Sequence, residues 1–93
     1  MSLPTKDRPE VVIYTTRSCA YCQAAKSLLR GKGIDVREID ITGDDDQRDE
    51  LVRRTGQRTV PQIFIGTRHV GGFEDLSALD QRGELDPLLG LGA

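Results

Sequence analysis

The 93-residue sequence has no tryptophan, one methionine, one histidine and only two cysteines. It contains no apolar run near the roughly 18 residues of a membrane-spanning helix, and its first residues lack the apolar segment of a secretory signal. Basic residues are not in excess: 13 Lys and Arg face 15 Asp and Glu, for a formal net charge of −2. These absences exclude a membrane span and argue against a nucleic-acid partner, which requires a basic surface. We therefore expect a soluble, cytoplasmic protein.

The length allows one domain and is too short for two. Residues 1–9 are polar, carry two prolines and show no periodicity, which predicts a flexible N-terminal tail. Residues 10–93 are expected to form a single domain, without internal repeats or low-complexity segments.

Short apolar runs separated by glycines predict alternating strands and helices. We expect strands at residues 11–15, 34–39, 62–65 and 69–70, the last two joined by a tight turn at 66–68. We expect helices at residues 19–30, 45–55 and 74–81, followed by a short turn that carries Leu85, Leu88 and Leu89. This order predicts an α/β protein of thioredoxin-like architecture, with a mixed four-stranded sheet and helices on both faces.

The two cysteines lie in the segment Cys19-Ala20-Tyr21-Cys22, where the first strand leads into the first helix. The thiolate is the nucleophile in disulfide exchange, and helix N-termini lower cysteine pKa values from about 8.5 to roughly 3.5–7.5. Cys22 shares a helical stripe with Ala25 and Leu29, so it should be buried, whereas Cys19 should stand at the exposed rim. We assign Cys19 as the attacking thiol and Cys22 as the resolving thiol.

Three alternative roles for the cysteine pair are weaker. A structural disulfide would close a loop of four residues and remove little chain entropy. A structural zinc site needs four ligands, and this sequence offers two sulfurs and the distant His69. Two unrelated buried cysteines would occupy the helix start only by accident. A C-x-x-C pair beside a strand–helix–strand pattern favours redox chemistry. His69 itself is expected at the surface.

Three motifs then appear in order along the chain: the cysteine segment, residues 55–66 (TGQRTVPQIFIG) and residues 71–76 (GGFEDL). With their spacing, they resemble the glutaredoxin family closely, and the resemblance extends over residues 11–89. It implies that Val60-Pro61 is a cis peptide bond that lies opposite Cys19, with the Val60 backbone pairing with the cysteinyl backbone of glutathione. From the residues alone, a trans proline that merely opens an edge strand is the alternative.

The resemblance also implies a glutathione-binding site around these motifs. The backbone N–H groups of Glu74 and Asp75, at a helix start, would hold the γ-glutamyl carboxylate, and the Asp75 carboxylate would meet the ammonium group. An acid-capped helix after a glycine turn is the plainer interpretation of the same residues. Gln57 and Arg58, with Thr16 and Arg17, would hold the glycine carboxylate, although the lysine that family members often carry near Thr16 is absent here. The full set of expected glutathione-binding residues is Arg17, Tyr21, Gln57, Arg58, Thr59, Val60, Pro61, Gly72, Phe73, Glu74 and Asp75.

The implied function is glutathione-dependent reduction of protein disulfides and protein–glutathione mixed disulfides. Glutathione moves to Cys19, a second glutathione releases it, and Cys22 resolves larger disulfides instead. The expected partners are glutathione and disulfide-bonded or glutathionylated proteins, and the expected state is a monomer. Two alternatives stay open at this point. One is a dimer bridged by a [2Fe–2S] cluster, with Cys19 as the ligand and Ala20 in place of the commoner proline. The other is an electron donor recharged by thioredoxin reductase.

Overall fold

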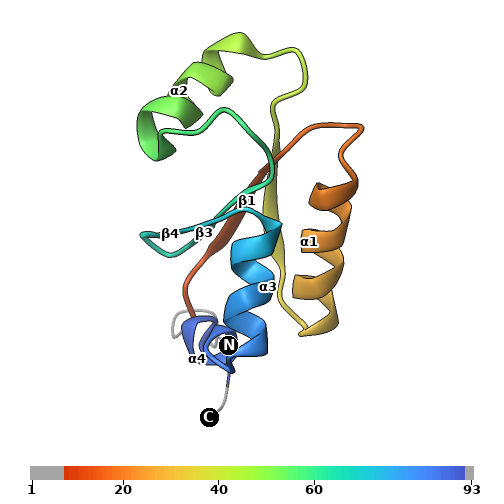
Figure 1. The fold of residues 1–93 in the computed structure, drawn as a ribbon, viewed down its shortest axis with the longest axis vertical. Helices are drawn as coiled ribbons and strands as arrows, with labels where there is room; N and C mark the ends of the chain where they lie inside the picture. The colour runs from red at the N-terminus through yellow and green to blue at the C-terminus, as the bar shows by residue number, and fades with distance from the viewer. Residues whose placement is uncertain (1–7, 92–93) are drawn as a thin grey trace, which may run out of the picture.

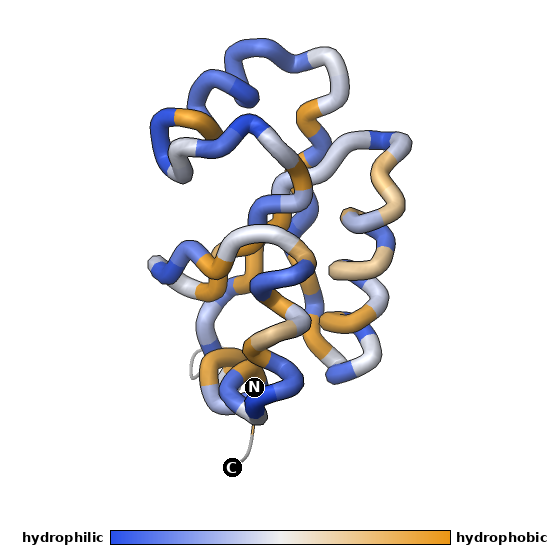
Figure 2. Tube along the Cα trace, in the orientation of Figure 1, coloured by the Kyte–Doolittle hydropathy of each residue, from blue (hydrophilic) through white to orange (hydrophobic). Residues whose placement is uncertain are grey.

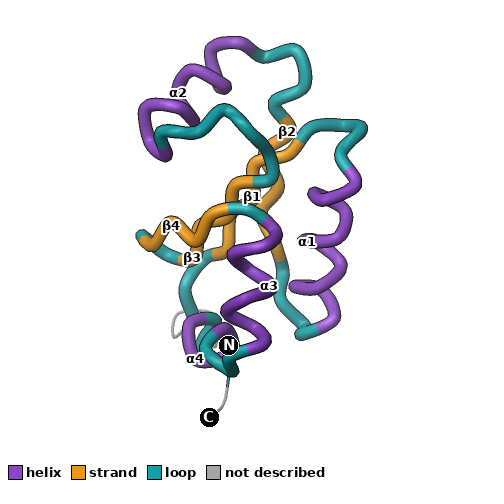
Figure 3. Tube along the Cα trace, in the orientation of Figure 1, coloured by secondary structure: helices purple, strands orange, loops and turns teal. Residues whose placement is uncertain are grey.

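The computed structural model of the chain describes residues 8–91, which form one sheet with helices packed against it (Figures 1 and 3). The strands are β1 (Val11–Thr15), β2 (Val36–Asp40), β3 (Gln62–Ile65) and β4 (Arg68–Gly71). The helices are α1 (Ala20–Gly31), α2 (Asp45–Thr55), α3 (Phe73–Gln81) and α4 (Leu85–Leu88). Among residues 8–91, no helix is long and apolar enough to cross a membrane.

The four strands are ordered β2-β1-β3-β4, with β1 and β2 parallel and the other two pairs antiparallel. This is the mixed four-stranded sheet that the sequence predicts. β1 lies inside the sheet between β2 and β3, which explains why its five residues are apolar or β-branched.

α1 begins and ends one residue later than predicted, and α3 begins one residue earlier. The boundaries of β2 and of the hairpin turn need correction too. The second strand begins at Val36 and not at residue 34, because the N–H of Ile34 donates to the carbonyl of Leu29 (3.1 Å) and belongs to the turn that ends α1. The hairpin turn is shorter than expected, because Arg68 already pairs with Ile65 and only Gly66 and Thr67 lie between the strands. Gly66 has a φ of 61°, which a glycine adopts without strain.

Alternate residues of the inner strands point to opposite faces of the sheet and build two hydrophobic clusters. On one face, Ile13 and Ile63 pack with residues of α1, α3 and α4. On the other face, Tyr14 and Phe64 pack with Leu51 of α2. Helices therefore cover both faces, as the sequence predicts. Figure 2 shows why α2 contributes less: it is hydrophilic along most of its length.

The smaller cluster is closed by the side chain of Arg54. Its guanidinium lies 4.3 Å from the centre of the Phe64 ring, and its Nη1 donates to the Tyr14 hydroxyl at 2.7 Å. A guanidinium over an aromatic face is stabilised by the ring quadrupole. Arg54 thus links α2 to the two inner strands.

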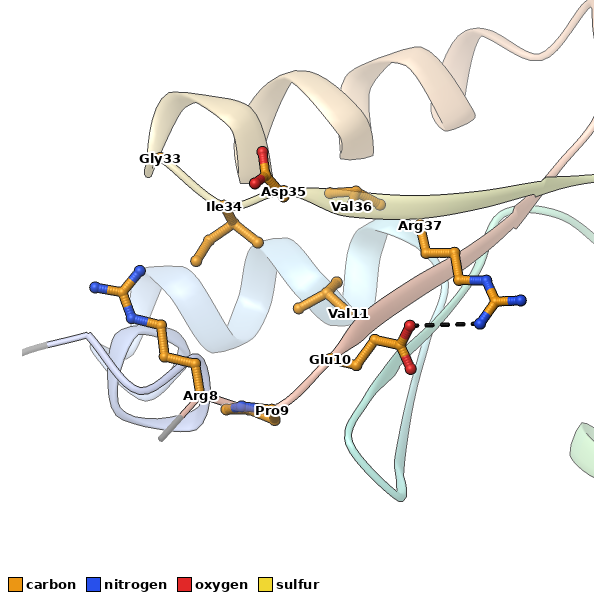
Figure 4. Close-up of a pocket in the computed structure, with 9 residues that line it drawn as sticks. All are labelled: Arg8, Pro9, Glu10, Val11, Gly33, Ile34, Asp35, Val36 and Arg37. Atoms are coloured by element: carbon orange, nitrogen blue, oxygen red, sulfur yellow. Dashed lines mark hydrogen bonds and ion pairs between the residues drawn. The ribbon is translucent and has the colours of Figure 1, made fainter. Parts of the chain in front are cut away.

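The expected N-terminal tail is described only in part, since residues 1–7 lie outside the described residues. Arg8 lies close to Gly90, and Pro9 lies close to Gly66. Arg8 also borders a hollow of about 520 Å³ at the start of β1, shown in Figure 4, where Glu10 and Arg37 form an exposed ion pair of 3.5 Å. The hollow contains neither cysteine.

A half-buried ion pair ties α1 to β2. Lys26 Nζ lies 2.9 Å from Glu38 Oε2, which also accepts a hydrogen bond of 2.7 Å from the Thr15 hydroxyl. Only 9% of the Lys26 side chain is exposed, against 34% of the Glu38 side chain. The hydrogen bond from Thr15, followed by that from Lys26, lowers the pKa of Glu38. A charged Glu38 is therefore the partner that lets α1 bury an ammonium group.

Replacement of this carboxylate should destabilise the protein. Glu38→Gln leaves the Lys26 ammonium beside a neutral amide, and we expect the free energy of unfolding to fall by about 1–2 kcal/mol near neutral pH, less than for a fully buried pair. The pKa of Glu38 is lower in the folded protein than in the unfolded chain, so the ionised carboxylate stabilises the fold at pH values above its unfolded-state pKa. That stabilisation is lost as the pH falls through the folded-state pKa of Glu38. Parent and variant should converge in acid. Urea unfolding near neutral pH and near pH 3 measures both effects.

Glu50→Gln is the matched control, because Glu50 pairs with Arg53 on the exposed side of α2. This change should alter stability little at either pH. Equal effects of the two substitutions would contradict the role given to Glu38.

Candidate active site

The first candidate side chain, Cys19, is the N-cap residue of α1. Its sulfur accepts a hydrogen bond from the backbone N–H of Cys22 at 3.1 Å, and its Sγ lies 3.8 Å from the Val60 carbonyl. The side chain is half-buried, so a substrate disulfide can approach it. A negative charge on this sulfur would face the positive end of the helix dipole, which stabilises anions.

Cys22 lies one turn further along α1 and is completely buried. It belongs to the same stripe as Ala25 and Leu29, both also buried, as the helical spacing predicts. Burial, reinforced by the hydrogen bond with Cys19, raises the pKa of Cys22 to about 12. At neutral pH Cys22 is therefore a neutral thiol, shielded from solvent, whereas Cys19 is accessible.

A groove of about 240 Å³ lies between the start of α1, the loop before β3 and the start of α3. One of its lining residues, Val60, has its carbonyl 3.8 Å from Cys19 Sγ. All the residues that line it belong to the set predicted to bind glutathione. They are Tyr21, Val60, Pro61, Gly72, Phe73, Glu74 and Asp75. The peptide bond between Val60 and Pro61 is cis, as the resemblance implied.

Tyr21 and Phe73 form the aromatic side of this groove. Their ring centres are 6.2 Å apart, and 61% of Tyr21 is exposed, the largest exposure of any bulky apolar residue among those described. Phe73 is half-buried and also packs against the larger hydrophobic cluster. An exposed tyrosine beside a half-exposed thiol offers an apolar surface to a peptide-like ligand.

At the far end of the groove, α3 begins at Phe73 with Gly72 as its N-cap. The Asp75 carboxylate accepts a hydrogen bond of 3.0 Å from the Gly72 N–H, so it caps the helix and faces the groove at once. Gly71 makes room for this contact. It has a φ of 118°, and a Cβ there would meet Asp75 Oδ2. A side chain at position 71 would therefore displace the carboxylate.

The other predicted glutathione-binding residues do not line this groove. Arg17, Gln57, Arg58 and Thr59 are exposed. Arg58 Nη1 lies 4.0 Å from Asp49 Oδ1 across two exposed side chains, and the Arg17 backbone N–H donates to Thr42 at 2.8 Å. Gln57 and Thr59 share a hydrogen-bonding partner, the buried amide of Gln62.

Sequence reasoning missed Gln62 and misjudged His69. His69 is half-buried, its ring centre lies 5.0 Å from that of Phe64, and its Nε2 lies 2.7 Å from Gln62 Oε1. The sequence signal for Gln62 was its place directly after Pro61 in a run of apolar residues, where a polar side chain needs a buried partner. The surface position predicted for His69 is wrong, because β4 turns its side chain toward this amide.

The family model for Glutaredoxin matches residues 11–70 of the chain. The chain belongs to the glutaredoxin family. An alignment of 81 residues, which covers 87% of this chain and 96% of the other protein, shows 56% identity to a glutaredoxin of Pseudomonas aeruginosa. A second alignment, of 79 residues, covers 85% of this chain and 95% of glutaredoxin 3 of Escherichia coli, with 53% identity.

Solved structures of other glutaredoxins share the fold. The chain superimposes on the crystal structure of a buckwheat glutaredoxin–glutathione complex with a TM-score of 0.83 and 32% identity, over 88% of this chain and 77% of that one. The thioredoxin-like fold predicted from the sequence is confirmed. With the family shown, the chain is a glutathione-dependent thiol–disulfide oxidoreductase, and this prediction is confirmed too.

The cluster-binding alternative is not favoured. Within residues 8–91, no three His, Cys, Asp or Glu side chains are grouped so that they would hold a metal ion. Cys19 is the accessible sulfur among them, since Cys22 is completely buried.

The difference in access predicts which thiol reacts first. Iodoacetamide added to the reduced protein should modify Cys19 well before Cys22, because Cys22 is buried and protonated at neutral pH. Timed quenching followed by peptide mass mapping measures the two rates. Faster labelling of Cys22 would contradict the burial of the stripe it shares with Ala25 and Leu29.

Proposed function

We propose that Cys19 is the attacking thiol of this oxidoreductase, that Cys22 is the resolving thiol, and that glutathionylated proteins are the principal substrates. The observation that carries the proposal is the position of the Cys19 sulfur. It sits at the N-terminus of α1 and lies 3.8 Å from the carbonyl of Val60, which lines a groove formed wholly by residues expected to hold glutathione.

In the first step, the Cys19 thiolate attacks the glutathione sulfur of a protein–glutathione disulfide. A new S–S bond forms between Cys19 and glutathione, the old one breaks, and the substrate leaves as a thiolate that takes a proton from water. The Val60 backbone flanks the attacking sulfur, since its carbonyl lies 3.8 Å from Cys19 Sγ. The Val60 N–H and carbonyl could pair with the cysteinyl backbone of a bound glutathione as one strand pairs with its neighbour.

In the second step, the thiolate of another glutathione attacks the glutathione sulfur that Cys19 carries. Glutathione disulfide leaves, and Cys19 returns as the thiolate at the helix end, ready for another cycle. Each step exchanges one disulfide bond for another, so no net oxidation occurs within it. Glutaredoxins have potentials of about −200 to −230 mV, near that of the glutathione pool, which makes both steps reversible.

Cys22 acts when Cys19 is linked to a protein disulfide partner and not to glutathione. Part of the raised pKa of Cys22 comes from its contact with Cys19, and that part is removed once the Cys19 sulfur is neutral in a mixed disulfide. The nearby Lys26 ammonium acts in the same direction. Cys22 thus becomes a better nucleophile at the stage when its attack is needed.

Glutathione would lie along the groove with its γ-glutamyl end at α3. The backbone N–H groups at the start of α3 suit its carboxylate, and Asp75 suits its ammonium group. The glycine carboxylate would reach toward Gln57, Arg58 and Arg17, beyond the groove. Gln57 Oε1 already accepts a hydrogen bond from Gln62 Nε2. The Nε2 group of Gln57 is therefore the donor that Gln57 can offer to a carboxylate.

We further propose that the protein acts in the cytoplasm as a monomer, with residues 10–93 as its single domain. A reducing compartment supplies the glutathione that the cycle consumes. The separation of attacking and resolving roles within one chain requires no second subunit.

The two roles predict an asymmetry between serine variants. Cys19→Ser should abolish activity on every substrate, because it removes the nucleophile. Cys22→Ser should keep much of the deglutathionylation activity, because that route uses Cys19 and glutathione alone. Turnover of a glutathionylated peptide, coupled to glutathione reductase and NADPH consumption, measures both.

The control is the same assay coupled to thioredoxin reductase, where we expect no turnover by the parent protein. An active Cys19→Ser together with an inactive Cys22→Ser would reverse the assignment. Efficient turnover with thioredoxin reductase and none with glutathione would refute the proposed electron source.

A second pair of variants tests the γ-glutamyl end of the groove. Asp75→Ala should weaken glutathione use by about 1–3 kcal/mol, seen as a raised KM for glutathione, because a charged partner of the ammonium group is lost. Asp75→Asn keeps an oxygen that can accept the Gly72 hydrogen bond, so it should raise KM while preserving the cap of α3. Thermal unfolding should separate the two, with Asp75→Ala the less stable. An unaltered KM in Asp75→Asn would mean that the carboxylate acts only as a cap.

A further inference from the structure

The buried side-chain amide of Gln62 connects the loop before β3 to the edge strand β4. Gln62 is 1% exposed and follows directly after Pro61, which lines the groove. Its Nε2 lies 3.0 Å from the Thr59 carbonyl, 3.0 Å from Gln57 Oε1 and 3.3 Å from the Thr59 hydroxyl. Its Oε1 lies 2.7 Å from His69 Nε2. One amide therefore holds the loop on one side and His69 on the other.

The chemistry of these contacts fixes which way the amide points. A main-chain carbonyl can only accept, so the Gln62 atom that faces the Thr59 carbonyl must be the NH₂ group. Its two hydrogens are engaged by Thr59 and Gln57. Gln62 Oε1 can then only accept, and the short contact to His69 requires a proton on His69 Nε2. The hydrogen-bond chain thus runs from His69 through Gln62 to the loop.

His69 is itself held in place. Its ring packs on Phe64, and Arg54 lies over that same Phe64 ring from α2. A side chain with both its ring and its Nε2 fixed can orient a neighbour, because little freedom is left for the donor to move. Without that donor, the Gln62 oxygen would be buried and unpaired, and the amide would lose the contact that holds it at the end opposite the loop.

We propose that His69 is a positioning residue for glutathione, which acts by donating its Nε2 proton to Gln62 and so fixes the loop formed by Gln57, Arg58, Thr59 and Val60. The inference rests on the proposed function, in which Gln57 and Arg58 hold the glycine carboxylate. His69 does not line the groove and does not contact the reacting sulfurs. Its effect should therefore appear in glutathione binding and not in the reactivity of Cys19.

The protonation of His69 can be tested without glutathione. Long-range ¹H–¹⁵N NMR correlation of ¹⁵N-labelled protein, at a pH where the imidazole is neutral, distinguishes the two ring nitrogens. We expect the proton on Nε2 and an unprotonated Nδ1. The opposite tautomer would overturn the proposal directly, since His69 Nε2 would then have nothing to donate.

Three variants test the effect on binding. His69→Leu removes the donor, His69→Gln replaces it with an amide N–H at a similar reach, and both lose the imidazole ring that packs on Phe64. We expect His69→Leu to raise the KM for glutathione about three- to tenfold, the scale of one hydrogen bond, with kcat and the iodoacetamide rate of Cys19 unchanged. His69→Gln should restore a KM near that of the parent. Arg68→Gln, an exposed neighbour on β4, should change nothing.

The outcomes separate this inference from the function on which it rests. An unchanged KM in His69→Leu, beside a raised KM in Gln57→Ala, would refute the role of His69 and leave the glutathione site standing. Equal defects in His69→Leu and His69→Gln would assign the effect to ring packing and refute the hydrogen bond. Absence of glutathione-dependent turnover in the parent would refute the proposed function, while the NMR result would still report on the contact between His69 and Gln62.

Discussion

Burial of one stripe of α1 against the sheet is the interaction on which the rest of the site depends. Cys22, Ala25 and Leu29 are completely buried, and this contact sets the rotation of the helix about its axis. Because the stripe begins at Cys22, in the first turn, Cys19 falls at the cap of the helix. The same packing that buries one thiol therefore presents the other at the end of the helix dipole.

The charges near the groove are not distributed evenly. Acidic Glu74 and Asp75 lie with helix N–H groups at the start of α3, whereas Arg17 and Arg58 are exposed in loops that do not line the groove. Beneath the site, the Lys26 ammonium is neutralised by Glu38 and so can stay near Cys22 without a large cost of burial. The backbone contributes to the site as well, since the Cys22 N–H donates to Cys19 Sγ and the Val60 carbonyl lies 3.8 Å from it.

The sequence predicted most of this fold because its signals are local. β1 and α2 lie at their expected bounds, since a β-branched run and an acid-capped helix closed by Gly56 are each complete within a few residues. Ile34 was misplaced because an apolar residue looks alike in a strand and in the turn that closes a helix. The C-x-x-C segment and the glycine pair before α3 are compact motifs and could be placed in advance.

What could not be predicted were the contacts between side chains that the fold brings together. Nothing near His69 in sequence indicates that its ring would pack on Phe64, or that Gln62 would face it across the hairpin. Likewise, the pairing of Lys26 with Glu38 depends on how α1 crosses β2. Such partners depend on the register of strands and the rotation of helices, which composition does not specify.

The close approach of Gly71 to Asp75 bears on how this groove can evolve or be redesigned. Any side chain at position 71 would push the carboxylate out of its place, and the left-handed backbone there disfavours such a residue in any case. Changes at 71 and 75 will therefore be strongly non-additive, so libraries that vary one position at a time will miss the workable combinations. A search for altered ligand preference should treat the two positions as one unit and vary Tyr21, on the opposite wall, independently.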